Sequence, residues 1–287
     1  MKTRFSLMAT CAWLGMVIVG TRASADVITQ WTFPQVTPAP DNHPVPTVGS
    51  GVATVLGMDN NYTFSGNNTI TGTGTFTFTG PSSTGSVAWA DITDTPGDPN
   101  GFANAWRVRG PSNNLGDPHG NGWALQAPQY TQGAQFSAST AGFTGIKFIF
   151  DWFATTQGVK NMQEQYTVNG TTWININNPL TAVSNGFAPQ QTIDFSGISG
   201  VADNPNFGVR LVSVYDTTLT PFVNYGSAAG GVYNNNSGNW RFADVRFIGT
   251  AIVPEPSPML LATLAAGLGL ARLRLRRPRV VKDESCG

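Results

Sequence analysis

The stretch Ile146-Lys147-Phe148-Ile149-Phe150-Asp151-Trp152-Phe153 decides the fold class, because it is apolar at almost every position. Only Lys147 and Asp151 interrupt the run. A short run of aromatic and β-branched residues is typical of a strand that is covered on both faces. It therefore predicts a central strand of a packed β-sandwich.

On both sides of this stretch, β-branched and aromatic runs alternate with turns rich in Gly, Pro, Asn and Asp, which is the pattern of antiparallel strands. The predicted strands are 27–33, 69–79, 86–90, 105–109, 123–126, 134–138, 145–154, 163–168, 172–175, 191–195, 206–214 and 240–249. Asn169-Gly170 predicts a type I′ hairpin turn. The predicted fold class is all-β, an antiparallel two-sheet β-sandwich of jelly-roll-like form, with a barrel as the alternative.

The charge of the predicted domain, residues 26–252, differs from that of the whole chain. The chain holds 16 basic and 16 acidic residues, whereas the domain holds seven basic and thirteen acidic ones, a net charge of −6. This balance argues against a nucleic-acid partner, which needs a basic surface. Cys11 and Cys286 both lie in the terminal segments, so the domain has no disulfide, and at this length a core forms without cross-links.

Residues 1–25 have the three parts of a secretory signal peptide: a basic start, an apolar middle and a small-residue end. Ala23 and Ala25 are the small residues that fit the cleft of signal peptidase. We expect cleavage after Ala25 and an exported chain that begins at Asp26. The alternative is a buried N-terminal helix.

A proline-rich motif at residues 253–258 follows the domain. Proline lacks an N–H and fixes φ, so the segment with Pro254, Glu255 and Pro256 continues neither a strand nor a helix. We therefore expect it to be extended and accessible to a processing enzyme.

An apolar segment at residues 259–271 comes next and is predicted to be a short transmembrane helix. At helical rise it covers about 20 Å of a hydrocarbon core that is roughly 30 Å thick, so it is a marginal anchor. The end, 272–287, is rich in arginine, and its stop-transfer residues are expected to stay cytoplasmic. They are Arg272, Arg274, Arg276, Arg277 and Arg279.

This order of Pro-Glu-Pro, apolar helix and arginine cluster in residues 253–287 resembles the PEP-CTERM sorting tail. The resemblance implies recognition by an exosortase-type membrane protease or transpeptidase and cleavage near Pro254-Glu255-Pro256. It also implies export through the inner membrane, transient anchoring, and delivery to the cell surface or extracellular matrix. The alternative is an anchor that is never cut. The segment 240–245 is loosely similar to the last strand of β-sandwich ectodomains in that family, although Ala243 stands where their pattern has Asp.

Few residues suggest catalysis. His43 and His119 lack a second histidine or a cysteine at ligand spacing, which disfavours a transition-metal site. A carboxylate pair is the remaining option, and Asp151 with Glu164 is the pair to test for glycoside cleavage. The alternative interpretation places Asp151 at a strand end and Glu164 in solvent.

The loop sequence 91–101 contains three aspartates, Asp91, Asp94 and Asp98, among turn residues. Carboxylate oxygens on a flexible loop are the ligands that Ca²⁺ prefers, so this segment is a candidate structural calcium site. The alternative is that these residues simply form turns, because Asp and Asn bond to their own backbone. No other cofactor is expected.

Four tryptophans lie near predicted loops, where an indole could stack on a sugar ring: Trp89, Trp106, Trp123 and Trp173. The alternative is that these rings fill the core. The sequence therefore favours a non-catalytic, exported surface or matrix protein that binds exopolysaccharide. The alternatives are a secreted polysaccharide-degrading enzyme and a purely structural spacer.

Overall fold

The computed structural model describes residues 25–37, 41–56, 63–69, 72–77, 89–109, 123, 129–219, 225–233 and 238–253. The chain divides into two compact units, Met1–Ala251 and Ile252–Gly287. The expected helices of the signal peptide and of segment 259–271, the motif residues 254–258 and the arginine-rich end lie outside the described residues. In the part that is described, no helix is long and apolar enough to cross a membrane.

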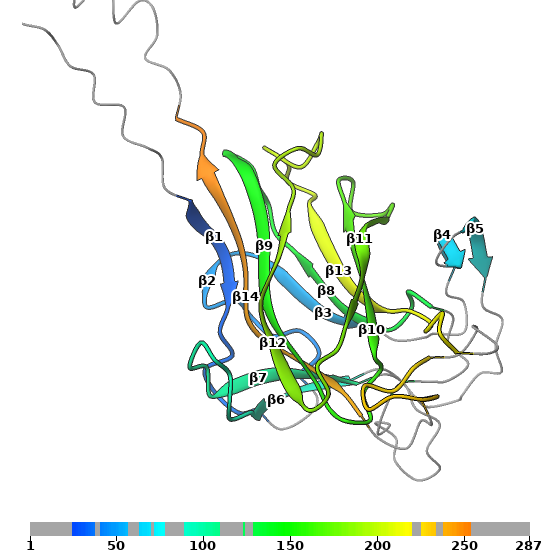
Figure 1. Ribbon diagram of the computed structural model, residues 1–287. Helices are drawn as coiled ribbons and strands as arrows, with labels where there is room; N and C mark the ends of the chain where they lie inside the picture. The colour runs from blue at the N-terminus through cyan, green and yellow to red at the C-terminus, as the bar shows by residue number, and fades with distance from the viewer. Residues whose placement is uncertain are drawn as a thin grey trace, which may run out of the picture. The chain divides into compact units, whose positions relative to one another are not determined.

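The described chain is all-β and forms two antiparallel sheets (Figure 1). Sheet A has the order β12 (Gly186–Asp194), β9 (Phe143–Ala154), β14 (Trp240–Ala251), β1 (Asp26–Trp31) and β2 (Val48–Gly49), with β7 (Asn104–Arg109) and β6 (Trp89–Asp94) attached through β14. Sheet B has the order β11 (Ile174–Thr181), β10 (Asn161–Thr167), β13 (Gly208–Ser213), β8 (Gly133–Ser137) and β3 (Val52–Leu56). A separate pair consists of β4 (Thr63–Thr69) and β5 (Gly72–Thr77).

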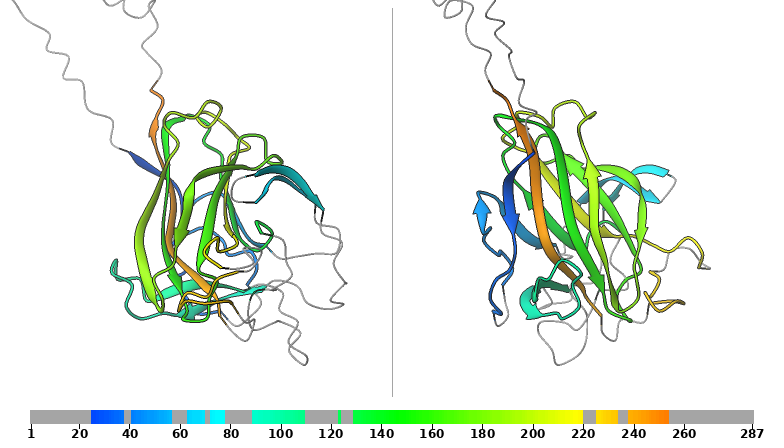
Figure 2. Two further views of the ribbon diagram at one scale, coloured as in Figure 1. Left: turned by 45° about the vertical axis from the view of Figure 1, so that its right-hand side comes forward. Right: turned by 60° about the vertical axis from the view of Figure 1, so that its left-hand side comes forward.

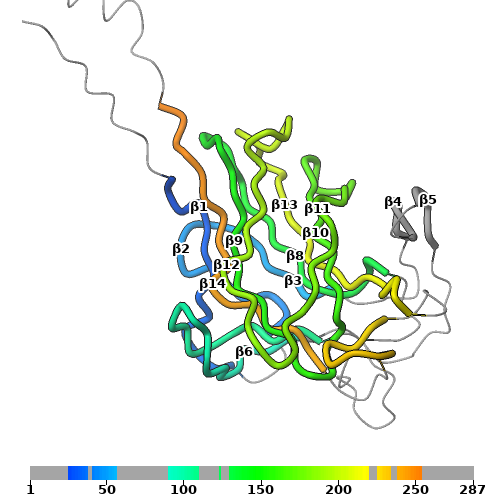
Figure 3. The backbone as a smooth tube through the Cα atoms, in the orientation of Figure 1, coloured from blue at the N-terminus to red at the C-terminus, as the bar shows by residue number. Residues whose placement is uncertain are grey.

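Strands β9 and β14 form the centre of sheet A, as the opening stretch predicted. Strand β14 pairs with β9 along one side, and its other side is shared between β7 at Trp240–Phe242 and β1 at Val245–Gly249. The register with β9 shifts between Ala243 and Arg246, where Asp244 adopts a positive φ of 44°. This β-bulge changes the direction in which the side chain of Asp244 points. The tube view traces β14 from the base of the sandwich to the first residues of β1 (Figure 3).

Aromatic rings fill the space between the two sheets, which Figure 2 shows as two curved layers. Phe136 on β8 of sheet B is fully buried and contacts four rings of sheet A. These are Trp31 at 5.4 Å, Phe148 at 5.5 Å, Trp106 at 5.7 Å and Phe242 at 6.1 Å between ring centroids. Because inner and outer residues alternate along each strand, the neighbouring residues face outward.

The predicted all-β class and the two packed sheets are confirmed, whereas some local predictions are wrong. Strand β10 ends at Thr167 and β11 begins at Ile174, so the connection is longer than a two-residue hairpin. Gly170 has a positive φ of 77° but Asn169 does not, so the turn is not type I′. Instead the Asn169 side chain accepts bonds from the backbone N–H groups of Thr171 and Thr172.

Two further differences concern the edge strands. Strands β2 and β3 were not predicted, and the single strand expected at 69–79 contains β5 and only the last residue of β4. The jelly-roll-like connectivity remains a prediction.

Replacement of Phe136 by alanine removes the ring that joins the two sheets. We expect Phe136→Ala to lower the free energy of unfolding by about 3–5 kcal/mol, the usual cost of truncating a buried phenylalanine. Urea unfolding of the full chain measures it. The control Phe187→Ala removes a half-buried ring on β12 that contacts Phe153, and an equal loss in both variants would contradict this account of the core.

Candidate functional site

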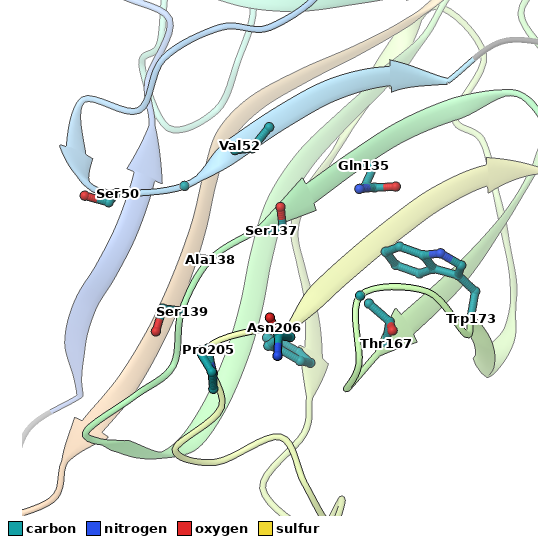
Figure 4. A pocket seen from close by; sticks show the side chains of 13 residues that line it. Ser50, Val52, Gln135, Ser137, Ala138, Ser139, Thr167, Trp173, Pro205 and Asn206 are labelled. Atoms are coloured by element: carbon teal, nitrogen blue, oxygen red, sulfur yellow. The ribbon is translucent and has the colours of Figure 1, made fainter.

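A groove of about 560 Å³ lies at one end of sheet B (Figure 4). Most of its lining residues are small or polar, and one indole and a few other apolar side chains complete the wall. It is lined by Ser50, Gly51, Val52, Gln135, Ser137, Ala138, Ser139, Thr167, Gly170, Trp173, Pro205, Asn206 and Phe207. In Figure 4, Trp173 and Thr167 lie on one side of the groove and Ser50 lies at the opposite end.

Strand register places these residues side by side. Ser137 on β8 pairs with Gly208 on β13 and with Val52 on β3, and Gly208 pairs with Thr167 on β10. Neighbouring positions in register share one face of a sheet, and the next row of the same strands, which includes Phe136, faces the core. These four residues therefore lie on the outer face, where Val52, Ser137 and Thr167 line the groove.

Trp173 is held in a fixed position at the groove. The Arg210 guanidinium lies 4.0 Å from the centre of its ring, and Arg210 Nε donates to Gln135 Oε1 at 2.8 Å. A cation over an indole face is attractive. A Cβ at Gly208 would come within 3.2 Å of Trp173 Cη2, so the glycine makes room for the ring. Only 9% of Trp173 is exposed, so most of the indole is covered and a small part of it lines the groove.

The other predicted sugar-stacking tryptophans differ from Trp173. Trp106 and Trp123 are fully buried. Trp106 Nε1 donates to the backbone oxygen of Asp41 at 2.9 Å, and the Trp123 ring lies 4.6 Å from that of Trp240. For these two residues the alternative interpretation, that the ring fills the core, is confirmed. The side chain of Trp89 lies outside the described residues.

The structure does not bring Asp151 and Glu164 into one cleft. Asp151 lies between the core residues Phe150 and Trp152 on β9, so it faces away from the core on the outer side of sheet A. Glu164 on β10 of sheet B pairs with Leu211 of the core, and both side chains face inward. The backbone of sheet A therefore separates the two carboxyl groups.

The alternative interpretation of this pair is also wrong, since Glu164 is buried and Asp151 lies within β9, which continues to Ala154. Glu164 is 2% exposed and accepts one hydrogen bond from Asn177 Nδ2 at 2.7 Å. Burial raises the pKa of Glu164 to about 7, against a smaller lowering by Asn177. The sequence signal that could have predicted the burial of Glu164 is indirect: the residues that pair with it on neighbouring strands are apolar.

The three aspartates of the predicted calcium site do not gather. Both oxygens of Asp91 are held by Arg107 of the adjacent strand. Asp94 lies three positions further along β6, on the opposite side of the strand, and is exposed. Of the three, only Asp98 lies beside another carboxyl group, that of Asp151. Among the described residues, no three His, Cys, Asp or Glu side chains are grouped so that they could hold a metal ion.

Replacement of Glu164 by glutamine should change how stability depends on pH. The unfolded carboxyl titrates near its ordinary pKa of 4.5, and the folded one near 7. The folded state therefore binds the proton more tightly, and stability falls as pH rises from about 4.5 through 7, by about 3 kcal/mol in total. Glu164→Gln should be more stable than the wild type by about this amount at pH 8 and equal to it at pH 4.

Thermal unfolding of both chains across this pH range checks the prediction. Titratable groups that the wild type and the variant share contribute equally to both, so they cancel when the two free energies of unfolding are subtracted. A difference that does not vary with pH would contradict a raised pKa at Glu164.

Comparisons with known proteins leave the family open. No family model matches the chain, and no curated protein matches it. Among solved structures, it is similar to the CBM22-1–GH10 modules of the N-terminal endo-1,4-beta-D-xylanase 10B of Clostridium thermocellum, complexed with xylohexaose. The identity is 9% and the TM-score 0.30, over 60% of this chain and 27% of that one, so this chain spans about a quarter of the length of its neighbour.

Proposed function

We propose that this chain is an exported, non-catalytic cell-surface or extracellular-matrix protein whose sandwich binds exopolysaccharide in the groove on sheet B. The observation that carries the proposal is the groove itself, where an indole fixed by Arg210 stands beside Gln135 and Asn206. Binding sites for small ligands combine apolar surface with a few polar groups that fix orientation.

The chemistry of the lining suits sugars. Ser137, Ser139 and the amides of Gln135 and Asn206 offer hydroxyl and amide groups, which both donate and accept hydrogen bonds. Sugar hydroxyls need that mixture. The exposed part of Trp173 adds apolar surface for the C–H groups of a pyranose ring.

The sorting part of the proposal rests on the two ends of the sequence. Signal peptidase cuts after Ala25, and an exosortase-type enzyme recognises Pro254, Glu255 and Pro256 while the 259–271 helix holds the chain in the membrane. The domain is then released to the cell surface or matrix.

The alternative of a polysaccharide-degrading enzyme has little support, because it needs two carboxyl groups across one cleft. Asp151 and Glu164 lie on different sheets and face different sides.

Removal of a groove side chain should weaken glycan binding. A broad glycan array probed with the full chain identifies the glycan, and calorimetry then compares Asn206→Ala and Trp173→Ala with the wild type. We expect a loss of about fivefold for Asn206→Ala, because one hydrogen bond contributes on the order of 1 kcal/mol. The control Asn178→Ala makes the same change at an exposed residue that does not line the groove.

Equal affinity of all four proteins for the glycan would overturn the groove as the binding site. Absence of binding to any glycan on the array would favour the structural spacer instead.

Replacement of Pro254, Glu255 and Pro256 by alanine should block sorting. Intact mass and cell fractionation of the wild type from its native host should give a species that begins at Asp26 and ends near Glu255. The variant should keep its tail and stay in the membrane. An intact, membrane-bound C-terminus in both strains would contradict exosortase-type processing and leave a simple anchored domain.

A further inference from the structure

The loop between β6 and β7, residues 95–103, is tied to the outer face of sheet A. Thr95 Oγ1 accepts from Arg241 Nη1 at 2.9 Å, and Thr95 N donates to the backbone oxygen of Ala103 at 2.8 Å. Asn100 Nδ2 lies 2.5 Å from Asp151 Oδ2. These contacts bring Asp98 from the loop next to Asp151 from the central strand β9.

Asp98 is 8% exposed, and one of its oxygens lacks a partner. Its Oδ1 accepts from the backbone N–H of Asn100 at 2.8 Å, whereas no donor among the described residues reaches the buried Oδ2. The carboxyl groups of Asp98 and Asp151 lie within hydrogen-bonding reach of each other. Burial raises the pKa of Asp98, and the neighbouring Asp151 carboxylate raises it further, although the Asn100 amide lowers it.

The nearby guanidinium group does not neutralise the two carboxyl groups of this pair. Asp151 Oδ1 accepts from Gln190 N at 2.6 Å. The nearby guanidinium of Arg246 is engaged by Asp244 and by Gln190 Oε1. Two buried carboxylates in contact are stable only with a proton or a cation between them.

The donor set at this position fits a hard cation. The terminal amide of Asn100 presents either nitrogen or oxygen toward Asp151 after a half turn, because the two ends of an amide have the same shape. In the turned orientation, oxygens from Asp98, Asp151 and Asn100 converge. Ca²⁺ takes six to eight oxygen ligands in flexible geometry and fills the rest of its shell with water or carbonyl oxygens.

We propose that Asp98, Asp151 and Asn100 hold a calcium ion that fastens the 95–103 loop to sheet A. The site is distinct from the groove on sheet B, and its failure leaves the proposed glycan binding untouched. It also differs from the predicted trio, because Asp91 and Asp94 take no part in it.

Calcium titration of the chelator-treated full chain tests this site. We expect saturable binding of one Ca²⁺ by calorimetry and a rise in Tm of about 5 °C or more when calcium is well above its Kd. Asp98→Asn should weaken calcium binding at least tenfold and abolish the rise in Tm. The control Asp94→Asn makes the same change at an exposed aspartate close by and should behave as the wild type.

Two results would overturn the proposal. If calcium leaves Tm unchanged while Asp98→Asn raises it at pH 7, the two carboxyl groups share a proton and the site holds no ion. If Mg²⁺ gives the same rise as Ca²⁺, or if Asp94→Asn loses binding as Asp98→Asn does, the assignment to calcium at these three residues is wrong.

Discussion

The packing of aromatic rings between the two sheets is the interaction on which the rest of the structure depends. Phe136 from sheet B contacts rings from β1, β7, β9 and β14 of sheet A. The sequence between Asp26 and Ile252 has no cysteine, so no disulfide helps to hold the two sheets together. Aromatic pairs with edge and tilted geometry add to the free energy of burial. Aromatic rings occupy the inward-facing positions of the strands. Because successive side chains point to opposite faces, the residues between them face outward and form the outer surfaces.

The two outer faces are consequently different surfaces. On sheet B, small residues such as Ser137 and Ser139 line a groove beside Trp173. On sheet A, charged residues on β6, β7 and β14 form two ion pairs, Asp91 with Arg107 and Asp244 with Arg246. The β-bulge at Asp244 turns that carboxylate toward Gln30 on the next strand. One core thus supports a candidate ligand groove on one face and a candidate cation site on the other.

The predictable part of this fold is the part that depends on local pattern. The apolar run at β9 and the strand at β14 were evident because they are long and bounded by turn residues. Edge strands β2 and β3 were missed, since two to five residues give too little pattern. Burial of Glu164 and the approach of Asp98 to Asp151 depend on residues 13 or more positions apart. Tryptophan content indicated candidate rings, but only the fold separates Trp173 at the groove from Trp106 in the core.

The indole N–H signals of the protein give the most direct test of the central claim, that a ligand binds on the outer face of sheet B. In a ¹H–¹⁵N correlation spectrum of the full chain, exopolysaccharide from the native host is added stepwise. The account predicts that the Trp173 indole signal and the side-chain amides of Gln135 and Asn206 shift together, while the buried Trp106 signal stays in place. Shifts confined to residues outside the groove, with Trp173 unchanged, would contradict it.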